Sequence, residues 1–216
     1  MGTIKQSGTL LVISAPSGAG KTTLCNRLVA ALPRLKLSVS MTTRQRRAGE
    51  QDGVNYLFVT PEQFRAAIKA DGLLEYAQVF GNFYGTPRSF VERHLARGID
   101  VVLNIDVQGA LQVRRKFRRQ AVFIFILPPS LTVLRQRLCR RGTDSAAEIK
   151  RRLAVARREM KFVRSYDYAV VNDDLDEAVA ALSAIVIATR CKVDKGGEGN
   201  VYGSDRRVVE KKRQRV

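Results

Sequence analysis

Near its start the chain carries a strand, a glycine-rich turn and a helix in immediate succession. The apolar run TLLVIS at 9–14 leads into APSGAGKT at 15–22, and Leu24 and Leu28 then recur at helical spacing, which predicts a helix over 21–32. This is the Walker A arrangement, in which loop amides and the helix N-terminus surround the oxygens of a phosphate. The unit predicts an α/β protein built on a parallel sheet.

The turn supplies the groups that phosphate chemistry needs. Gly18 and Gly20 let the backbone approach a phosphate closely, Lys21 would contact the phosphate being transferred, and Thr22 would hold Mg²⁺. Ala15 replaces the first glycine of the strict pattern, and it fits if its φ angle is negative. A turn that merely joins a strand to a helix is the alternative, but the Gly-Lys-Thr run stands at the offset that a nucleoside triphosphate requires. The predicted loop comprises Ala15, Pro16, Ser17, Gly18, Ala19, Gly20, Lys21, Thr22 and Thr23.

Strand-like and helix-like segments alternate along the rest of the chain. Runs rich in β-branched and aromatic residues at 100–106 and 121–127 predict buried strands, and the alternating sequence LKLSVSM predicts another strand over 35–41. Thr60 and Gln63 form a capping box at the start of a helix. Strands of this type with helices between them predict a parallel sheet flanked by helices on both faces.

Two segments interrupt this alternation. Residues 36–90 contain hairpin-like strands, and residues 137–160 are strongly charged. A capping box of Ser145 and Glu148 predicts a long, arginine-rich helix that extends to about Tyr166. Both segments have the character of insertions that could move as lids.

The formal net charge of +18 implies an anionic partner. Nucleotides and nucleic acids both satisfy this requirement, and a solvated basic surface explains part of the charge equally well. Residues 191–216 are basic, contain several glycines and show little periodicity, which predicts a flexible tail. Such a tail could bind nucleic acid weakly and without sequence preference, although no aromatic-rich nucleic-acid motif accompanies it.

The numbers and positions of the cysteines and the histidine argue against several kinds of disulfide and metal site. Cys25, Cys139 and Cys191 are odd in number and widely scattered, which argues against a disulfide framework or a zinc site, and His94 alone cannot form a histidine cluster. No apolar run approaches the roughly 18–20 residues that a membrane span requires, and no signal-peptide cleavage pattern is present. We therefore expect a cytoplasmic protein without a membrane partner, whose oligomeric state stays open.

One further segment, SMTTRQRRAGEQDGVNYLFV at 40–59, combines hydroxyls, three arginines, a Gly-Glu pair and a tyrosine. Arginines at this density beside Thr and Tyr predict a site for a compact anion, because guanidinium forks match the geometry of phosphate oxygens. The segment therefore predicts a second anion site, separate from the glycine-rich loop.

This segment, extended to 38–59, is the first of several motifs that follow one another in unbroken order. The others are LLEYAQVFGNFYGT at 73–86, NIDVQG at 104–109, RLCRRGTD at 137–144 and VVNDDLD at 170–176. Together they closely resemble the guanylate kinases, over roughly residues 9–190. The resemblance implies ATP-dependent transfer of a phosphoryl group to GMP, and to dGMP, which gives GDP and ADP with Mg²⁺ as cofactor. ATP and GMP are the partners that it implies.

The resemblance also implies how the chain is divided. The family's fold is a P-loop core, with a parallel sheet flanked by helices, to which an inserted monophosphate-binding domain and a helical lid are added. The implied parts are a core of residues 1–37, 88–128 and 163–190, a GMP-binding domain of residues 38–87, a lid region of residues 129–162 and a basic tail of residues 191–216.

The family's site for the GMP phosphate carries over onto the arginine-rich segment. Arg44 and Arg47 match the arginines that bind this phosphate, and Tyr56 and Tyr84 match the tyrosines whose hydroxyls donate to it. Glu50 matches the acid that orients those arginines or bound water. The compact anion is therefore expected to be the phosphate of a nucleoside monophosphate.

The guanine base needs hydrogen-bonding partners that differ from those of the phosphate. Guanine presents adjacent donors at N1 and N2, which a carboxylate accepts, and its O6 is an acceptor. By resemblance, Glu75 and Asp106 are the carboxylates, and Ser40 and Thr86 the hydroxyls near O6. Adenine would leave a buried carboxylate unpaired, so such a site discriminates by about 10⁴ or more. Ordinary surface carboxylates at strand ends are the alternative for Glu75 and Asp106.

Phosphoryl transfer requires positioning and positive charge more than covalent chemistry, so no general base is assigned. A solvated helix face is the alternative for any one arginine of the lid. Asn172 corresponds to a position near the adenine, and Asn104 stands where the family commonly has an acid, so that Mg²⁺ would rely more on Thr22. The candidates for stabilising the transferred charge are Lys21, Arg44, Arg137, Arg141 and Arg152.

Three other functions stay open on the sequence. A binding module of the same family without catalysis would lose the phosphate loop, which Gly18, Lys21 and Thr22 argue against. A transferase that acts on a phosphorylated sugar would not need the purine-recognising carboxylates Glu75 and Asp106. Nucleic-acid binding through the tail is the third.

Overall fold

The computed structural model describes residues 7–79, 81–117, 120–140 and 145–192. Within these ranges the larger of two sheets contains five parallel strands in the order β2-β7-β1-β8-β9. This parallel sheet confirms the predicted fold class. The strands are β1 (Leu10–Ser14), β2 (Leu35–Leu37), β7 (Asp100–Asn104), β8 (Ala121–Leu127) and β9 (Tyr168–Val171).

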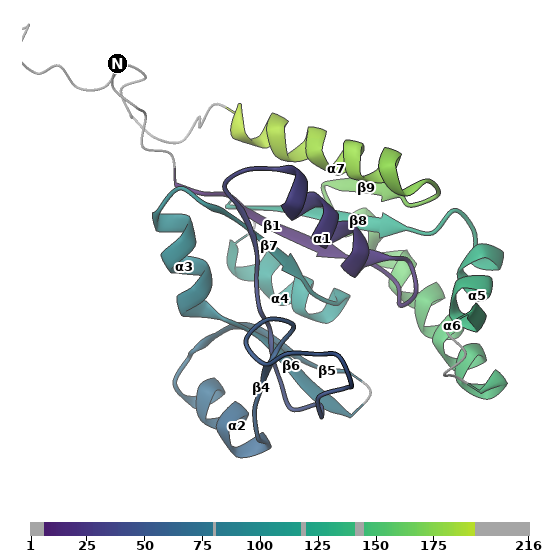
Figure 1. Cartoon of the computed structure of the whole chain (residues 1–216), viewed down its shortest axis with the longest axis horizontal. Helices are drawn as coiled ribbons and strands as arrows, with labels where there is room; N and C mark the ends of the chain where they lie inside the picture. Colours follow the sequence, from purple (N-terminus) through teal and green to yellow (C-terminus); the bar gives the residue numbers. More distant parts are fainter. Residues whose placement is uncertain (1–6, 80, 118–119, 141–144, 193–216) are drawn as a thin grey trace, which may run out of the picture.

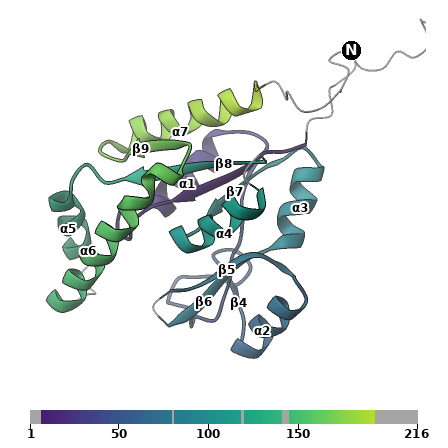
Figure 2. The same ribbon diagram turned by 180° about the vertical axis from the view of Figure 1, so that it is seen from behind.

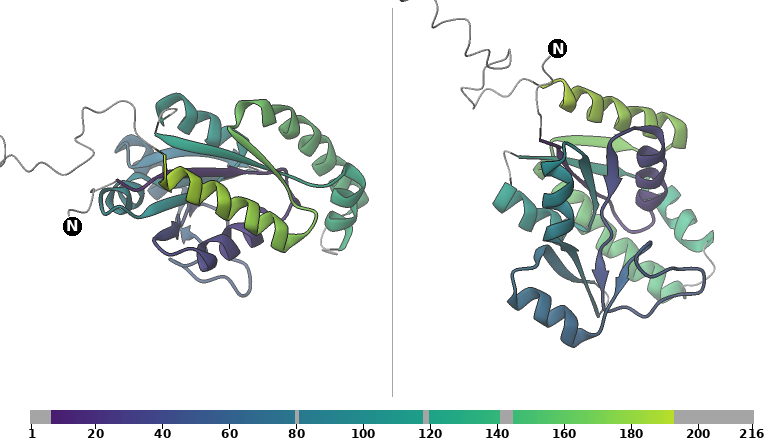
Figure 3. Two further views of the ribbon diagram at one scale, coloured as in Figure 1. Left: turned by 90° about the horizontal axis from the view of Figure 1, so that it is seen from above. Right: turned by 60° about the vertical axis from the view of Figure 1, so that its left-hand side comes forward.

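Helices cover both faces of this sheet (Figure 1 and Figure 3). Side chains alternate across the central strand β1, so that Leu11 and Ile13 pack on one face while Leu10 and Val12 pack on the other. The first face packs against α1 (Lys21–Ala31) and α7 (Leu175–Arg190), and the second against α3 (Arg88–Ala96) and α4 (Val107–Phe117). The continuous apolar sequence of β1 follows from burial on both faces.

A second sheet lies beside the carboxyl ends of the large one, in the order β4-β3-β6-β5 (Figure 2). Its long strands β5 and β6 pair antiparallel, as the predicted hairpin requires. Helix α2 contributes the buried Phe64, whose ring stacks on Phe83 at 5.4 Å between centroids. The elements are β3 (Met41–Thr42), β4 (Leu57–Phe58), α2 (Pro61–Lys69), β5 (Leu73–Val79) and β6 (Asn82–Pro87).

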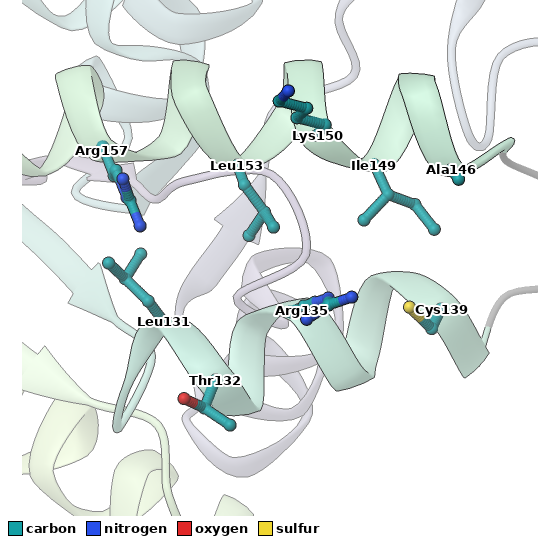
Figure 4. A pocket seen from close by; sticks show the side chains of 9 residues that line it. All are labelled: Leu131, Thr132, Arg135, Cys139, Ala146, Ile149, Lys150, Leu153 and Arg157. Carbon is teal, nitrogen blue, oxygen red and sulfur yellow. The ribbon is translucent and has the colours of Figure 1, made fainter.

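Two helices, α5 (Leu131–Arg140) and α6 (Ala146–Met160), lie together at one end of the molecule. Leu134, Leu138 and Ala156 form a small core between them. Between the two helices is also a groove of about 550 Å³, into which Leu131, Ile149 and Leu153 point (Figure 4). This pair of helices therefore has a hydrophobic core separate from the two that cover the large sheet.

The two capping boxes predicted from the sequence differ in how fully they form. Thr60 and Gln63 exchange both hydrogen bonds, at 2.9 and 3.3 Å. Ser145 accepts a hydrogen bond from the backbone nitrogen of Glu148 at 3.2 Å, which is one half of such a box. Both residues begin their helices as predicted.

Two predicted elements were wrong in their extent. The strand expected over 35–41 is divided: β2 ends at Leu37, the backbone nitrogen of Ser38 donates to the Val102 oxygen, and the chain then crosses to the second sheet, where β3 begins at Met41. The helix expected to reach about Tyr166 ends at Met160 and continues as a 3₁₀ turn over Lys161–Ser165.

Among the described residues, no helix combines the length and apolar character needed to cross a bilayer. Residues 193–216 of the predicted basic tail lie outside the described ranges, and so does the proposed nucleic-acid contact of that tail.

The end of α7 is held to the large sheet by one buried acid. The Arg190 Nε donates to Asp100 Oδ2 at 2.7 Å, and the Thr9 backbone nitrogen donates to Asp100 Oδ1 at 2.7 Å. Arg190 also donates to the Pro33 oxygen at 2.8 Å. Since the Asp100 side chain is only 8% exposed, its charge depends on these partners.

We predict that Arg190→Ala lowers the free energy of unfolding by roughly 1–3 kcal/mol, because it leaves a buried carboxylate oxygen without its hydrogen-bond donor. Urea denaturation measures this loss. The matched control is Arg27→Ala, which removes an equally short Arg–Asp pair whose side chains are 49% and 77% exposed. This control should cost less than about 1 kcal/mol. Equal effects of the two substitutions would contradict the prediction.

Candidate active site

The glycine-rich loop joins β1 to α1 at the carboxyl end of the large sheet. Gly18 and Gly20 have φ angles of 94° and 87°, which side chains rarely adopt. A Cβ atom at Gly18 would collide with Leu138 of α5, and one at Gly20 with the Asn172 amide. Among the non-glycine residues that the structure describes, only Arg34 and Asp71 have positive φ, so alanine is accommodated at position 15 without strain.

Lys21 is partly buried where several elements meet. Its Nζ donates a hydrogen bond to the Ile105 backbone oxygen at the end of β7. Burial lowers the pKa of Lys21, while the charges of Asp106, Glu159 and Glu75 act to raise it. Burial therefore disfavours the charged form of Lys21, and the nearby carboxylates favour it, at the point where the loop meets the second sheet.

Thr22 follows Lys21 at the start of α1, and the Asn104 amide nitrogen approaches its hydroxyl at 3.5 Å. Within the described ranges, no cluster of three or more His, Cys, Asp or Glu side chains is arranged to hold a metal by itself. The Thr22 hydroxyl and the Asn104 amide are thus polar side-chain groups that lie together at the start of α1.

The arginine-rich segment folds around Glu50, in the loop between β3 and β4. Arg44 Nη2 donates to Glu50 Oε1 at 2.7 Å, and the Arg47 backbone nitrogen donates to Glu50 Oε2 at 2.8 Å. The hydrogen bond from Arg44 lowers the pKa of Glu50. The Arg44 guanidinium lies 5.3 Å from the centroid of the Tyr56 ring, and this ring lies 6.0 Å from that of Tyr84.

Side-chain contacts therefore bring together four of the five predicted phosphate-site residues, namely Arg44, Glu50, Tyr56 and Tyr84. Arg47 differs from the rest, because its side chain is exposed and only its backbone contacts Glu50. The cluster offers guanidinium and phenol donors to an anion while Glu50 fixes their orientation.

Glu75 lies on β5 with 4% of its surface exposed. Thr86 on β6 donates from Oγ1 to Glu75 Oε1 at 2.7 Å. Burial raises the pKa of Glu75 to about 7, and the nearby Asp106 charge adds to this, while the Thr86 hydrogen bond opposes it. Such a carboxyl is costly to ionise until a ligand donates hydrogen bonds to it.

Asp106 lies at the end of β7, with Oδ1 accepting from the Gly109 backbone nitrogen at 2.8 Å. A Cβ atom at Gly109 would collide with the Glu75 carboxylate, so the glycine gives both acids room. Ser40 precedes Met41, whose partner on β6 is Gly85, next to Thr86. The structure thus brings Glu75, Thr86 and Asp106 together, and Ser40 directly precedes β3.

Arg152 of α6 contacts the loop directly, whereas Arg137 of α5 contacts Asn172, which is itself bonded to the loop. Arg152 Nη2 donates to Ser17 Oγ at 2.6 Å, and Arg137 Nη2 donates to the Asn172 backbone oxygen at 2.9 Å. The buried Asn172 in turn donates from Nδ2 to the Ala19 oxygen at 2.7 Å. Arg141 lies outside the described residues.

Two residues of this site were not predicted from the sequence. The Ile105 backbone oxygen accepts a hydrogen bond from Lys21 Nζ. The Glu159 carboxylate of α6 lies near Ser17 and Lys21. A backbone acceptor leaves no trace in the sequence. The available signal for Glu159 was its spacing of seven residues from Arg152, which places both on one face of a helix.

Comparison with known proteins gives a consistent result. A family model described as guanylate kinase matches residues 7–189. A guanylate kinase of Caldanaerobacter subterraneus subsp. tengcongensis is 53% identical over 192 residues, which are 89% of this chain and 93% of that protein. One from Hahella chejuensis is 53% identical over 186 residues, or 86% and 89%. The crystal structure of guanylate kinase from Anaplasma phagocytophilum is 37% identical with a TM-score of 0.75, covering 88% of this chain and 90% of that one.

The raised pKa of Glu75 predicts a pH-dependent stability in the unliganded protein. The unfolded chain loses this proton near pH 4.5, whereas the folded protein keeps it to about pH 7. Unfolding therefore releases a proton within this window, and stability falls as the pH rises through it.

Relative to Glu75→Gln, which cannot ionise, the wild type should lose about 3 kcal/mol between pH 4.5 and pH 7. Urea denaturation of both proteins across this range measures the difference. Glu62→Gln, a change at an exposed position of α2, should show no such divergence. If the difference in unfolding free energy between wild type and Glu75→Gln stayed constant across this pH range, the raised pKa of Glu75 would be contradicted.

Proposed function

Because this chain belongs to the guanylate kinase family, it is a kinase that transfers a phosphoryl group from ATP to GMP, and we propose which of its residues carry out that reaction. The observation that carries the assignment is the placement of a buried carboxyl–hydroxyl pair, Glu75 and Thr86, on a sheet next to the phosphate-binding loop. A purine edge and a triphosphate can then be held on the two sides of one reaction centre.

The donor side is the loop of residues 15–23. Its amides and the N-terminus of α1 bind the phosphates of ATP, and Lys21 neutralises charge on the group in transfer. Arg137 and Arg152 add positive charge from α5 and α6, and Arg141 completes this set when the lid region closes. Asn172, which is hydrogen-bonded to the loop at the Ala19 oxygen, borders the adenine.

Magnesium fits the donor side through few protein ligands. The Thr22 hydroxyl would coordinate it, and Asn104 would act through the water around it, since its amide lies 3.5 Å from that hydroxyl. When bound, Mg²⁺ supplies charge neutralisation to the phosphates. The amide carries no charge of its own, so Asn104 contributes less to this site than a carboxylate would.

The acceptor phosphate is bound by the cluster around Glu50. Arg44 is already oriented by its ion pair with Glu50 at 2.7 Å, so that little side-chain freedom remains to be lost on binding. Arg47, Tyr56 and Tyr84 supply the other donors. The phosphate oxygen that attacks ATP is ionised at neutral pH, so the reaction needs no general base.

The guanine is recognised by Glu75 and Asp106, which accept from its N1 and N2 hydrogens, while Thr86 and Ser40 donate near O6. Guanine binding satisfies the ionised Glu75 with two donors, and this favours its charged form. Because the 2′-hydroxyl of the sugar plays no part in this recognition, dGMP is a substrate as well.

The chain is divided for this purpose into a core of residues 1–37, 88–128 and 163–190, a GMP-binding domain of residues 38–87 and a lid of residues 129–162. The separate sheet of the second and the separate core of the third support the division. Because ATP and GMP are nucleotides of the cell interior, we also propose a cytoplasmic location.

Replacing Lys21 by Ala should lower kcat by about 10²–10³, because the charge on the transferring phosphate loses a partly buried counter-ion. A coupled assay of ADP release measures this. The affinity for GMP, measured by calorimetry, should stay within about threefold of wild type, since Lys21 serves the donor side. Lys69→Ala, at an exposed position of α2, is the matched control and should keep full activity. Retained turnover in Lys21→Ala would refute the role of Lys21.

Glu75→Gln tests the assignment of the base. The wild type should prefer GMP over AMP by about 10⁴ in kcat/KM, accept dGMP and reject ribose 5-phosphate. The amide offers a donor where guanine needs an acceptor, so Glu75→Gln should reduce the preference for GMP at least tenfold, as an expected order of magnitude. Glu62→Gln should leave it intact. An unchanged GMP/AMP ratio in Glu75→Gln would remove the basis for this assignment.

A further inference from the structure

Helix α6 presents two side chains of opposite charge to one residue of the phosphate-binding loop. Arg152 and Glu159 are seven residues apart, which places them two turns apart on the same helix face. Arg152 donates to the Ser17 hydroxyl at 2.6 Å, and the Glu159 carboxylate lies near the Ser17 backbone nitrogen, which acts to lower its pKa. Two side chains of the same helix thus face Ser17, one at its hydroxyl and one near its backbone nitrogen.

Glu159 is also part of the charge balance around Lys21. Its carboxylate interacts favourably with the Lys21 ammonium. Its Oε2 is inaccessible to water and has no hydrogen-bond partner among the residues that the structure describes. Burial raises the pKa of Glu159 to about 7, with Lys21 opposing the shift and Asp106 adding to it. A partly buried carboxylate of this kind is stabilised chiefly by its neighbours, Ser17 and Lys21.

The reaction itself gives Glu159 no proton to accept, because the attacking oxygen belongs to an ionised phosphate. Its negative charge would also repel a bound triphosphate. A role in catalysis must therefore come through the groups that Glu159 holds.

We propose that Glu159 is a positioning residue, which fixes the phosphate-binding loop against α6 by holding the Ser17 amide and balancing the Lys21 ammonium. This inference rests on the proposed role of Lys21 in phosphoryl transfer. It also explains why Arg152 and Glu159 share one helix: docking of α6 brings an arginine to the donor phosphates and aligns the lysine in a single movement.

The charge of Glu159 has opposite consequences for binding and for catalysis. Without it, repulsion of the triphosphate is lost, so ATP should bind as well or better. Lys21 and Ser17, however, lose the partner that aligns them, so transition-state stabilisation should fall. The expected signature is a lower kcat with an unchanged or lower KM for ATP.

The test compares Glu159→Gln with Glu148→Gln, a matched change on the same helix at a residue paired with the exposed Arg151. Glu159→Gln should lower kcat roughly tenfold, since small misplacements of reacting groups have effects of this size or larger. The KM for ATP should not rise, and the midpoint of thermal unfolding should stay within a few degrees. Hydrogen exchange measured by NMR should be faster at the Ser17 amide. Glu148→Gln should leave all four quantities unchanged.

A kcat within twofold of wild type in Glu159→Gln would overturn the proposal, and so would a parallel loss of kcat, ATP affinity and thermal stability, which indicates a purely structural role. If Glu159→Gln does not fold, Glu159→Asp decides the question: the charge is kept, so a kcat above that of Glu159→Ala supports the proposal and an equal kcat overturns it. Lys21→Ala serves as a separate arm. Full turnover there would refute the proposed function of Lys21 itself, whatever Glu159 does.

Discussion

The structure depends on a partly buried ammonium group. Lys21 belongs to the loop between β1 and α1, yet its charge interacts with carboxylates from three other places: Asp106 after β7, Glu75 in the second sheet and Glu159 on α6. Each carboxylate alone would be costly to bury, and so would the lysine. Because they compensate one another only when assembled, core, second sheet and α6 share one electrostatic centre, and we propose that phosphate transfer takes place at the same centre.

Close backbone approach makes this centre possible. Gly109 at the start of α4 leaves room for the Glu75 carboxylate, and Gly20 leaves room for the Asn172 amide. Next to Gly109, the side chain of Gln112 pairs with both backbone groups of Tyr76 and fastens β5 to α4. The proposed specificity for the base and the attachment of the second sheet to the core thus involve the same few residues of α4 and β5.

Much of this could be predicted from the chain alone, where local pattern and tertiary structure agree. The strand, loop and helix around Lys21 are one local unit, and its sequence indicates both its shape and its ligand. The segment 35–41 shows the limit, because its alternation continues across the point where the chain leaves one sheet for another, and period alone does not tell which sheet a strand joins. The resemblance named Glu75 and Asp106, whereas Glu159 in a charged helix gave no local sign of its partner 142 positions earlier in the chain, Ser17.

The order of strands also affects how the protein is made. The central strand β1 is synthesised first, but Leu10 pairs with Val101 of β7 and Ala121 of β8, so it waits about 90 residues for its first neighbour. At ~5–20 residues per second this is roughly 5–20 s of translation, during which an uncharged apolar strand lacks both flanking partners. Nascent chains of this protein therefore pass through an aggregation-prone interval that ends only when β7 and β8 have left the ribosome.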